Sequence, residues 1–203
     1  MLQLGKIRNH IVKYRNYCLA ILALFLLGFF IGCFYANLCG ETDFETGLQS
    51  ASLFIEAAKK SELDYQLLLF EESLPYLLIA GSALCLFGIP VITFLVFKTG
   101  FSVGFFLTFL VKGLALKGFF LGAVFLLVQV LFFLPALLVI AIQSFRTNLF
   151  LLFACTHRLS PKQSLKNELL FLAVALFSGV LLLFLGVGIK YLSLPPLCNY
   201  LFL

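Results

Sequence analysis

The chain has 203 residues, of which 63% are hydrophobic and only 11% are charged. A soluble domain of this length would carry about 25% charged residues, so water could not solvate the surface that this composition implies. The net charge of +5 is modest and unevenly placed, which argues against a nucleic-acid-binding protein. The composition instead predicts a protein whose surrounding medium is the lipid bilayer.

The first two predicted elements are a basic segment at 1–17 and an apolar run at 18–39. Apolar residues of the basic segment recur on one helical face, so we expect a cytoplasmic amphipathic helix held by anionic lipid. The run at 18–39 is long enough for a first transmembrane helix. A cleaved signal peptide is the alternative, although the run is long for one and no small-x-small cleavage site follows it.

The next segment, 40–73, is acidic and is predicted to be an extracytoplasmic loop containing short helices. Eight of the nine carboxylates of the chain lie here, and against Lys59 and Lys60 they give a local net charge of −6. The loop is either a solvated acidic cap or a docking surface for an extracytoplasmic protein. The carboxylates that would bind such a partner are Glu41, Asp43, Glu45, Glu56, Glu62, Asp64, Glu71 and Glu72.

Two apolar runs after the acidic loop predict the second and third transmembrane helices. The second helix, at 74–97, would contain Pro90 as a kink. The third, at 99–116, is short before Lys112, so it either spans with that lysine at the interface or forms a re-entrant hairpin.

The predicted fourth transmembrane helix, at 118–143, contains Gln129 and Pro135. An amide side chain in hydrocarbon should hydrogen-bond to a neighbouring helix, and Pro135 should bend this one. The contact is first a packing device, and a substrate pathway is the less favoured interpretation.

The chain closes with a basic cytoplasmic loop at 144–167, a fifth transmembrane helix at 168–192 and an extracytoplasmic tail at 193–203. In a five-span arrangement with the N-terminus inside, nine basic residues face the cytoplasm and five face outside, as the positive-inside rule requires. We therefore expect an all-α polytopic membrane protein with five transmembrane helices, a cytoplasmic N-terminus and an extracytoplasmic C-terminus.

Three Gly-x-x-x-Gly pairs fall in separate predicted helices. Glycines four residues apart make a flat strip on which two helix backbones approach closely, so they indicate a tightly packed bundle or, less securely, a homodimer. The candidate packing residues are Gly28, Gly32, Gly100, Gly104, Gly118 and Gly122.

Residues that carry catalysis or bind cofactors are not evident in the sequence. No ionisable side chain is expected near the centre of a span, and Lys98, Lys112, Lys117, Glu168 and Lys190 are all assigned to span ends. Cys155 and His157 alone are too few ligands for zinc. A disulfide between Cys39 and Cys198 is conceivable, because both would lie near the outer interface. We expect no catalytic, metal or cofactor site.

A set of short motifs carries a family resemblance. They are the run Phe97–Phe105 (FKTGFSVGF), the run Phe109–Gly113 (FLVKG), Lys117-Gly118-Phe119, and Gln129 leading to Leu134-Pro135-Ala136. In this order and spacing they resemble the core of the stage II sporulation protein M family. Where the broader family often has a His and a Glu around Leu-Pro-Ala, this chain has Gln129 and Phe133, as in the branch from sporulating Firmicutes.

The resemblance implies a membrane scaffold that is not itself an enzyme. Proteins of this family lie in the mother-cell membrane at the sporulation septum and work with two cell-wall hydrolases, stage II sporulation proteins D and P. Together they remodel septal peptidoglycan during engulfment of the forespore. The alternative for this chain is a permease-like or channel-like subunit, in which Gln129, the short third helix and the proline kinks would line a path.

Overall fold

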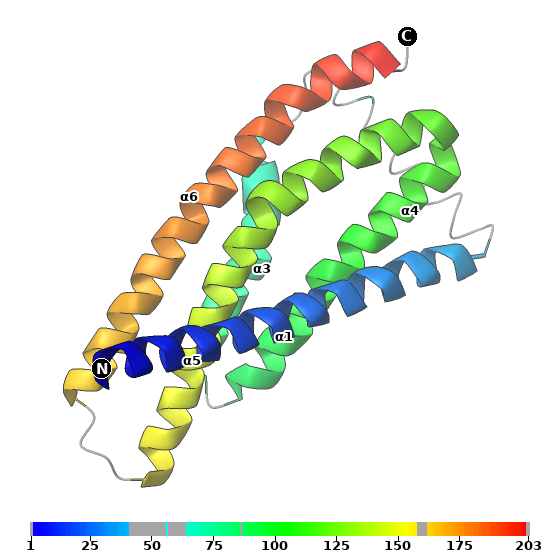
Figure 1. The fold of residues 1–203 in the computed structure, drawn as a ribbon. Coiled ribbons are helices and arrows are strands. Elements are labelled where there is room, and N and C mark those ends of the chain that lie inside the picture. The colour runs from blue at the N-terminus through cyan, green and yellow to red at the C-terminus, as the bar shows by residue number, and fades with distance from the viewer. Residues whose placement is uncertain (1, 41–55, 57–63, 86, 158–161, 202–203) are drawn as a thin grey trace.

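The structure, a computed structural model, describes residues 2–40, 56, 64–85, 87–157 and 162–201. These residues form a bundle of long helices and contain no β-strand (Figure 1). The helices are α1 (Leu2–Leu38), α3 (Tyr65–Ser82), α4 (Gly88–Val128), the π-helix η1 (Gln129–Phe133), α5 (Leu134–His157) and α6 (Lys162–Leu201). The prediction of an all-α membrane protein is confirmed in its class.

Three stretches of the described helices are apolar and long enough to cross a membrane: Arg15–Leu38, Gly88–Ala154 and Glu168–Leu201. The middle stretch is not one rod, because Ala115 has the non-helical angles φ 48° and ψ −124° and reverses the chain within α4. We call the two halves the first arm (88–114) and the second arm (116–128). They lie antiparallel in Figure 1.

The predicted second and third spans have the wrong boundaries. The run 74–97 is not one helix kinked at Pro90, because α3 ends at Ser82 and a turn precedes Gly88. Pro90 lies in the first turn of α4, where its missing N–H leaves no hydrogen bond unmade. The following helix is not short either, since the first arm begins at Gly88 and its 27 residues extend for about 40 Å.

Helices also continue through segments predicted to be loops or tails. The basic segment 144–167 is helical at both ends, in α5 and α6, and α6 runs through the predicted tail as far as Leu201. The segment 1–17 is continuous with the first span in α1. Regular hydrogen bonding does not stop at the edge of the apolar stretch, so hydropathy predicts the span but not the end of its helix.

Two of the glycine pairs, Gly28 with Gly32 and Gly100 with Gly104, lie where α1 packs against the first arm of α4. A Cβ added at Gly28 or Gly32 would lie on a carbonyl oxygen of α4, and one added at Gly100 or Gly104 would lie on a carbonyl oxygen of α1. The backbones are thus close enough for Cα–H···O contacts, which is how Gly-x-x-x-Gly strips associate in lipid. All four glycines therefore pack against a neighbouring helix of the same chain.

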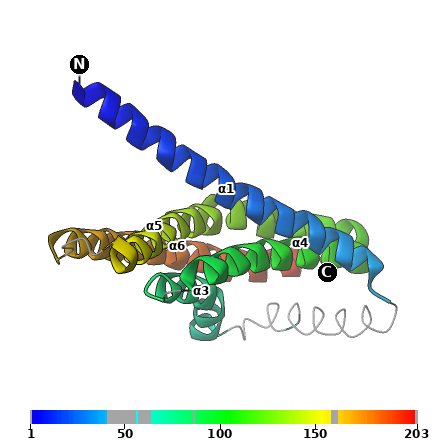
Figure 2. The ribbon, with the colours of Figure 1, turned by 90° about the horizontal axis from the view of Figure 1, so that it is seen from below.

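The third glycine pair closes the α4 hairpin. A Cβ at Gly118 would meet the carbonyl oxygen of Leu110, and one at Gly122 would lie 2.7 Å from the Leu107 side chain. In Figure 2, α1 crosses the other helices at an angle and its N-terminal half projects from the bundle.

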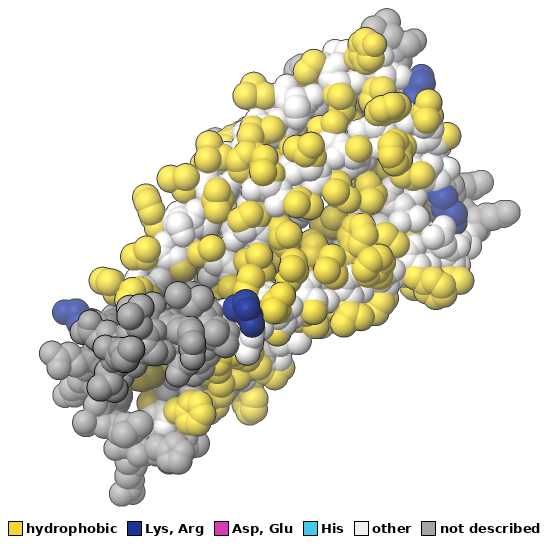
Figure 3. Space-filling view, in the orientation of Figure 1, with side chains coloured by type: hydrophobic (Ala, Val, Ile, Leu, Met, Phe, Trp, Pro, Cys, Tyr) yellow, Lys and Arg dark blue, Asp and Glu magenta, His cyan; other side chains and the backbone are white. Residues whose placement is uncertain are grey.

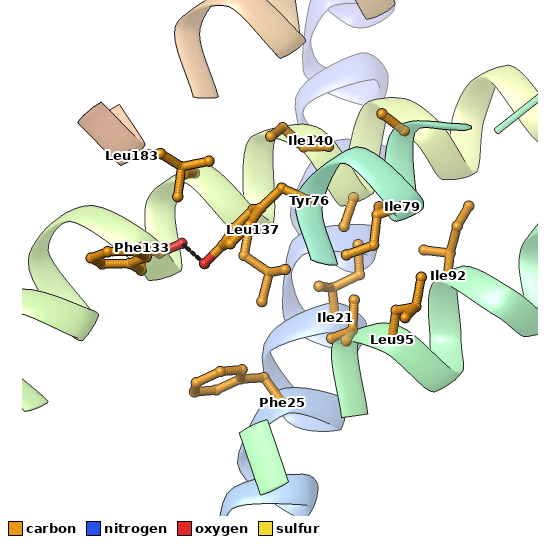
Figure 4. Packing of buried hydrophobic residues seen from close by; sticks show 14 of the residues in the cluster. Ile21, Phe25, Tyr76, Ile79, Ile92, Leu95, Phe133, Leu137, Ile140 and Leu183 are labelled. Atoms are coloured by element: carbon orange, nitrogen blue, oxygen red, sulfur yellow. Dashed lines mark hydrogen bonds between the residues drawn. The ribbon is translucent and has the colours of Figure 1, made fainter. Parts of the chain in front are cut away.

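The hydrophobic core lies where α1, α3, α4, α5 and α6 meet. Figure 4 shows Ile21 of α1 and Ile79 of α3 close to Leu95 of α4, with Phe133 and Leu137 on the side away from α4. Hydrophobic side chains are spread over the face drawn in Figure 3, and Phe34 and Phe177 are 66% and 75% exposed. Such a surface is stable only where lipid or protein covers it, so the chain is membrane-associated.

Candidate functional site

Lys190 is the most informative side chain of the described part of the molecule. Although it carries an ammonium group, it is only 4% exposed, at the junction of α6 with α3 and η1. Its Nζ lies 2.6 Å from Oε1 of Glu72 and 3.5 Å from Oε1 of Gln129. The rings of Phe133 and Phe125 face the ammonium, with centroids 4.3 and 5.1 Å from Nζ. Carboxylate, amide and aromatic faces together compensate for its removal from water.

The π-helix η1 places Gln129 beside Lys190. Pro135 has no N–H to donate, and the widened turn before it uses the N–H of Leu134 to reach the carbonyl oxygen of Gln129, five residues earlier. The expected bend near Pro135 therefore takes the form of a π-helical turn. The phenol of Tyr76, on α3, donates to the carbonyl oxygen of Phe133 over 3.4 Å (Figure 4). Polar groups of α3, η1 and α6 thus converge on one point.

A cavity of about 730 Å³ lies against this cluster, between α3, both arms of α4, and α6. Its polar lining includes Glu71, Glu72, Lys98, Gln129 and Lys190, and the rest is mainly Phe and Leu. A cavity of this size with a few convergent polar groups in an apolar wall is the usual form of a ligand site.

The cluster lies well inside the apolar part of the bundle. Gln129 is 12 residues from Lys117 and 17 residues from Arg146, which correspond to about 18 and 25 Å of helix. The expectation that no ionisable group lies near the middle of a span is therefore wrong. Lys190 does not extend to the outer interface, because turning inward to Glu72 gives its ammonium a carboxylate partner within the bundle.

A second polar cluster joins the middle of α5 to the N-terminal part of α6. Arg146 forms an ion pair with Glu168 at 3.2 Å, and Nε2 of Gln143 donates to the same carboxylate at 3.2 Å. Glu168 was assigned to the end of a span. It lies in the second turn of α6, and its ion-pair partner is Arg146.

Asn148 fixes the turn between α3 and α4. Its side-chain Nδ2 donates to the carbonyl oxygens of Ala83 (3.3 Å) and Cys85, the first residues after α3. Ser144 and Thr147, on the same face of α5, are fully buried, and their hydroxyl oxygens have no hydrogen-bond partner in the described part of the chain. Asn148 thus supplies a side-chain donor to the turn, where the carbonyl oxygen of Cys85 also accepts from the N–H of Gly88.

Lys112 caps the C-terminal end of α1. Its Nζ donates to the carbonyl oxygens of Ala36 and Asn37, both at 3.3 Å. The ammonium thus satisfies terminal carbonyl groups and lies at the negative end of the helix dipole, where it is stabilising. Lys112 was expected to reach for the membrane interface, and the structure gives it this intramolecular role instead.

The predicted partner-binding carboxylates are only partly described. Glu41, Asp43, Glu45 and Glu62 lie outside the described residues, and Glu56 is exposed. Asp64 caps α3 by accepting from the N–H of Gln66 at 2.9 Å, Glu71 is exposed on α3, and Glu72 pairs with Lys190. The acidic set is therefore divided between the segment 41–63 and the helix α3, not confined to a loop at 40–73.

The cysteines form no disulfide among the described residues. Neither Cys39 nor Cys198 forms a disulfide there, so the bridge considered between them is not made. Cys155 and His157 fall in the last turn of α5. Across the described residues, no group of three His, Cys, Asp or Glu side chains is placed to hold a metal ion.

Sequence reasoning missed the pairing of Lys190 with Glu72, which lies 118 positions away. A usable signal was present. Lys190 interrupts an otherwise apolar run, and such a residue needs a partner wherever its helix does not end. The helix continues to Leu201, so Lys190 is an interior residue.

Comparison with known proteins gives one match. The family model described as SpoIIM, Stage II sporulation protein M, matches residues 21–190. The match begins at Ile21, the first core residue of α1, and ends at Lys190 in α6. No curated protein and no solved structure matches the chain. The matched range contains the glycine pairs, the α4 hairpin and the Lys190 cluster.

Proposed function

Because the chain belongs to the stage II sporulation protein M family, we propose that it is a non-enzymatic membrane scaffold that anchors and positions peptidoglycan hydrolases. The hydrolases would be stage II sporulation proteins D and P, acting on septal wall during engulfment. The chain would lie in the mother-cell membrane at the sporulation septum. Family membership and the apolar helices support a sporulation membrane protein, and the scaffold role rests on the argument that follows.

The proposed topology has five passes with the N-terminus in the cytoplasm and the C-terminus outside. The passes would be α1, α3, the first arm of α4, the second arm continued by η1 and α5, and α6. This arrangement puts the basic residues of the N-terminal part of α1 and those around the α5–α6 turn on the cytoplasmic side. Lys98 and Lys190 would lie within the membrane region, and eight of the remaining basic residues would face the cytoplasm against four outside. That distribution obeys the positive-inside rule.

The observation that carries the scaffold proposal is how both ends of the acidic segment are held. Lys112 caps α1 just before it, and α1 is packed against α4 by four glycines. After it, Asp64 caps α3, and the ring of Tyr65 packs edge-on against Tyr191 of α6, with centroids 5.6 Å apart. The segment 41–63, with its five carboxylates, is thus bounded on each side by a fixed helix end, as a docking segment should be.

The test is a pull-down of the hydrolases with the full-length chain in detergent. Changing Glu41, Asp43, Glu45, Glu56 and Glu62 to their amides should abolish hydrolase recovery if these carboxylates dock the partner. The matched control neutralises Arg158, Lys162 and Lys166 on the proposed cytoplasmic side and should leave recovery unchanged. Equal hydrolase recovery with the amide variant would refute docking through this segment.

A permease-like or channel-like subunit is the second candidate, favoured by the cavity beside Lys190. Buried ionisable groups within an apolar bundle mark substrate or ion paths in many membrane proteins, and a π-helix often lies at such sites. Substrate-dependent flux in proteoliposomes that disappears with Gln129→Leu would support this candidate. Unchanged flux in that variant would remove it.

A further inference from the structure

The cavity described above combines polar groups with a long apolar wall. Its polar groups include those of Lys190, Gln129 and Glu72, and the first arm of α4 continues from Lys98 towards Ala115 with aromatic residues on the cavity wall. These are Phe101, Phe105, Phe106 and Phe109, and Phe125 of the second arm faces Phe106 at 5.4 Å. From Lys98 to Phe109 the wall is about 16 Å long. This shape suits an amphiphile with one hydrocarbon chain and a polar head.

Two charges on the cavity wall are left without an ion-pair partner among the described residues. Glu72 is already paired with Lys190, so the remaining carboxylate is that of Glu71 and the remaining ammonium is that of Lys98. Both residues are exposed. An isolated charge beside hydrocarbon is costly, so each of the two calls for an opposite charge.

These two charges come from two different helices that line the cavity, α3 and the first arm of α4, at similar helical distances from the turn between them. Glu71 is 11 residues before the end of α3, and Lys98 is 10 residues after the start of α4, so each is about 15 Å from the turn that joins the two antiparallel helices. The hydroxyl of Ser102 follows Lys98 by one helical turn and lines the same cavity. The site therefore offers a cation and a hydroxyl from one helix and an anion from the other.

We propose that this cavity binds a phospholipid with a phosphoethanolamine headgroup. The phosphate would accept from Lys98 and Ser102, the ammonium would donate to Glu71, and one acyl chain would lie along the phenylalanines of the first arm. A zwitterion neutralises both unpaired charges, whereas an anionic headgroup would leave Glu71 unpaired and repelled. This site goes beyond the scaffold role and does not use the segment 41–63.

The test is native mass spectrometry of the full-length chain released from detergent. Dioleoyl phosphatidylethanolamine, phosphatidylglycerol and phosphatidylcholine serve as probes that share their acyl chains. The wild type should bind phosphatidylethanolamine more tightly than the other two lipids. Lys98→Gln should lower its affinity about tenfold, the loss expected for one charge-assisted hydrogen bond. Lys166→Gln, at an exposed lysine away from the cavity, should change nothing.

Two further variants separate a specific site from general lipid contact. Glu71→Gln leaves a net positive wall, so the preference should reverse from phosphatidylethanolamine to phosphatidylglycerol. Ser102→Phe should obstruct the cavity one helical turn from Lys98 and weaken binding of all three lipids while the protein still elutes as a monodisperse species. A wild type that shows no preference among the headgroups, or a Glu71→Gln variant with unchanged preference, would overturn the proposal. Hydrolase recovery by Lys98→Gln should equal that of the wild type, so the scaffold proposal and the lipid-site proposal can be refuted separately.

Discussion

Removing one partner of the Lys190–Glu72 pair should destabilise the bundle more than removing both. The side chain of Lys190 is 5% exposed and that of Glu72 is 28% exposed, so the two ions are buried to different degrees. Glu72→Leu leaves a buried ammonium whose remaining polar and aromatic contacts, among the described residues, are Gln129, Phe125 and Phe133. Lys190→Leu leaves a carboxylate that water reaches more easily.

The magnitudes follow from that asymmetry. Breaking a buried pair by deleting one ion typically costs about 3–5 kcal/mol, and we expect about 3 kcal/mol for Glu72→Leu. Lys190→Leu should cost about half of that, because its orphan is the more exposed ion. The double replacement should lie within about 1 kcal/mol of the wild type, since apolar residues of similar volume then fill the site.

Reversible unfolding in mixed micelles with increasing dodecyl sulfate, followed by circular dichroism, measures these differences. The four proteins of the cycle give the coupling free energy between the two sites directly. If the double variant loses the sum of the two single losses, the ions do not stabilise each other. A Lys190→Leu variant that is less stable than Glu72→Leu would refute the argument from burial.

The remaining predictions use the same unfolding assay. Gly104→Leu should cost more than 2 kcal/mol because its side chain would displace the α1 backbone. Gly188→Leu, with open space around it, should have little effect. Equal losses in the two variants would contradict close packing of α1 against α4. Lys112→Gln should cost about 0.5–1 kcal/mol by uncapping α1, and no loss at low salt would exclude the cap. Asn148→Leu should cost about 2–3 kcal/mol by removing the buried side-chain donor to the carbonyl groups of Ala83 and Cys85. Asn37→Leu, at an exposed site, should be near neutral.

The family and the helical class were readable from the sequence. Motifs such as FKTGFSVGF and Leu134-Pro135-Ala136 carry the resemblance that the family match at 21–190 confirms. The glycine pairs indicated close helix packing, but their partners were not readable. Which backbone a glycine strip meets depends on how the chain reverses, and Ala115, the residue that reverses it, is not a typical turn residue.

The turn after Ser82 could not be located from the sequence because hydropathy does not distinguish one long helix from two short ones. The run from Leu74 to Phe97 is almost uniformly apolar, and the turn within it is stabilised by Asn148, more than 60 residues later. A turn whose carbonyl groups are satisfied by a distant side chain leaves little local signal. Only the packing of α5 against the turn reveals it.

Charge segregation and the apolar runs determined that this chain is a helical membrane protein, because hydrocarbon tolerates few other compositions. The same counting placed Lys190 at the end of a span and Glu72 in a loop. The tertiary structure decided that the two meet, because α3 and α6 pack side by side and burial leaves each ion no better partner than the other. A pairing across 118 residues depends on the fold and has no trace in local pattern, so the candidate site became visible only in the assembled bundle.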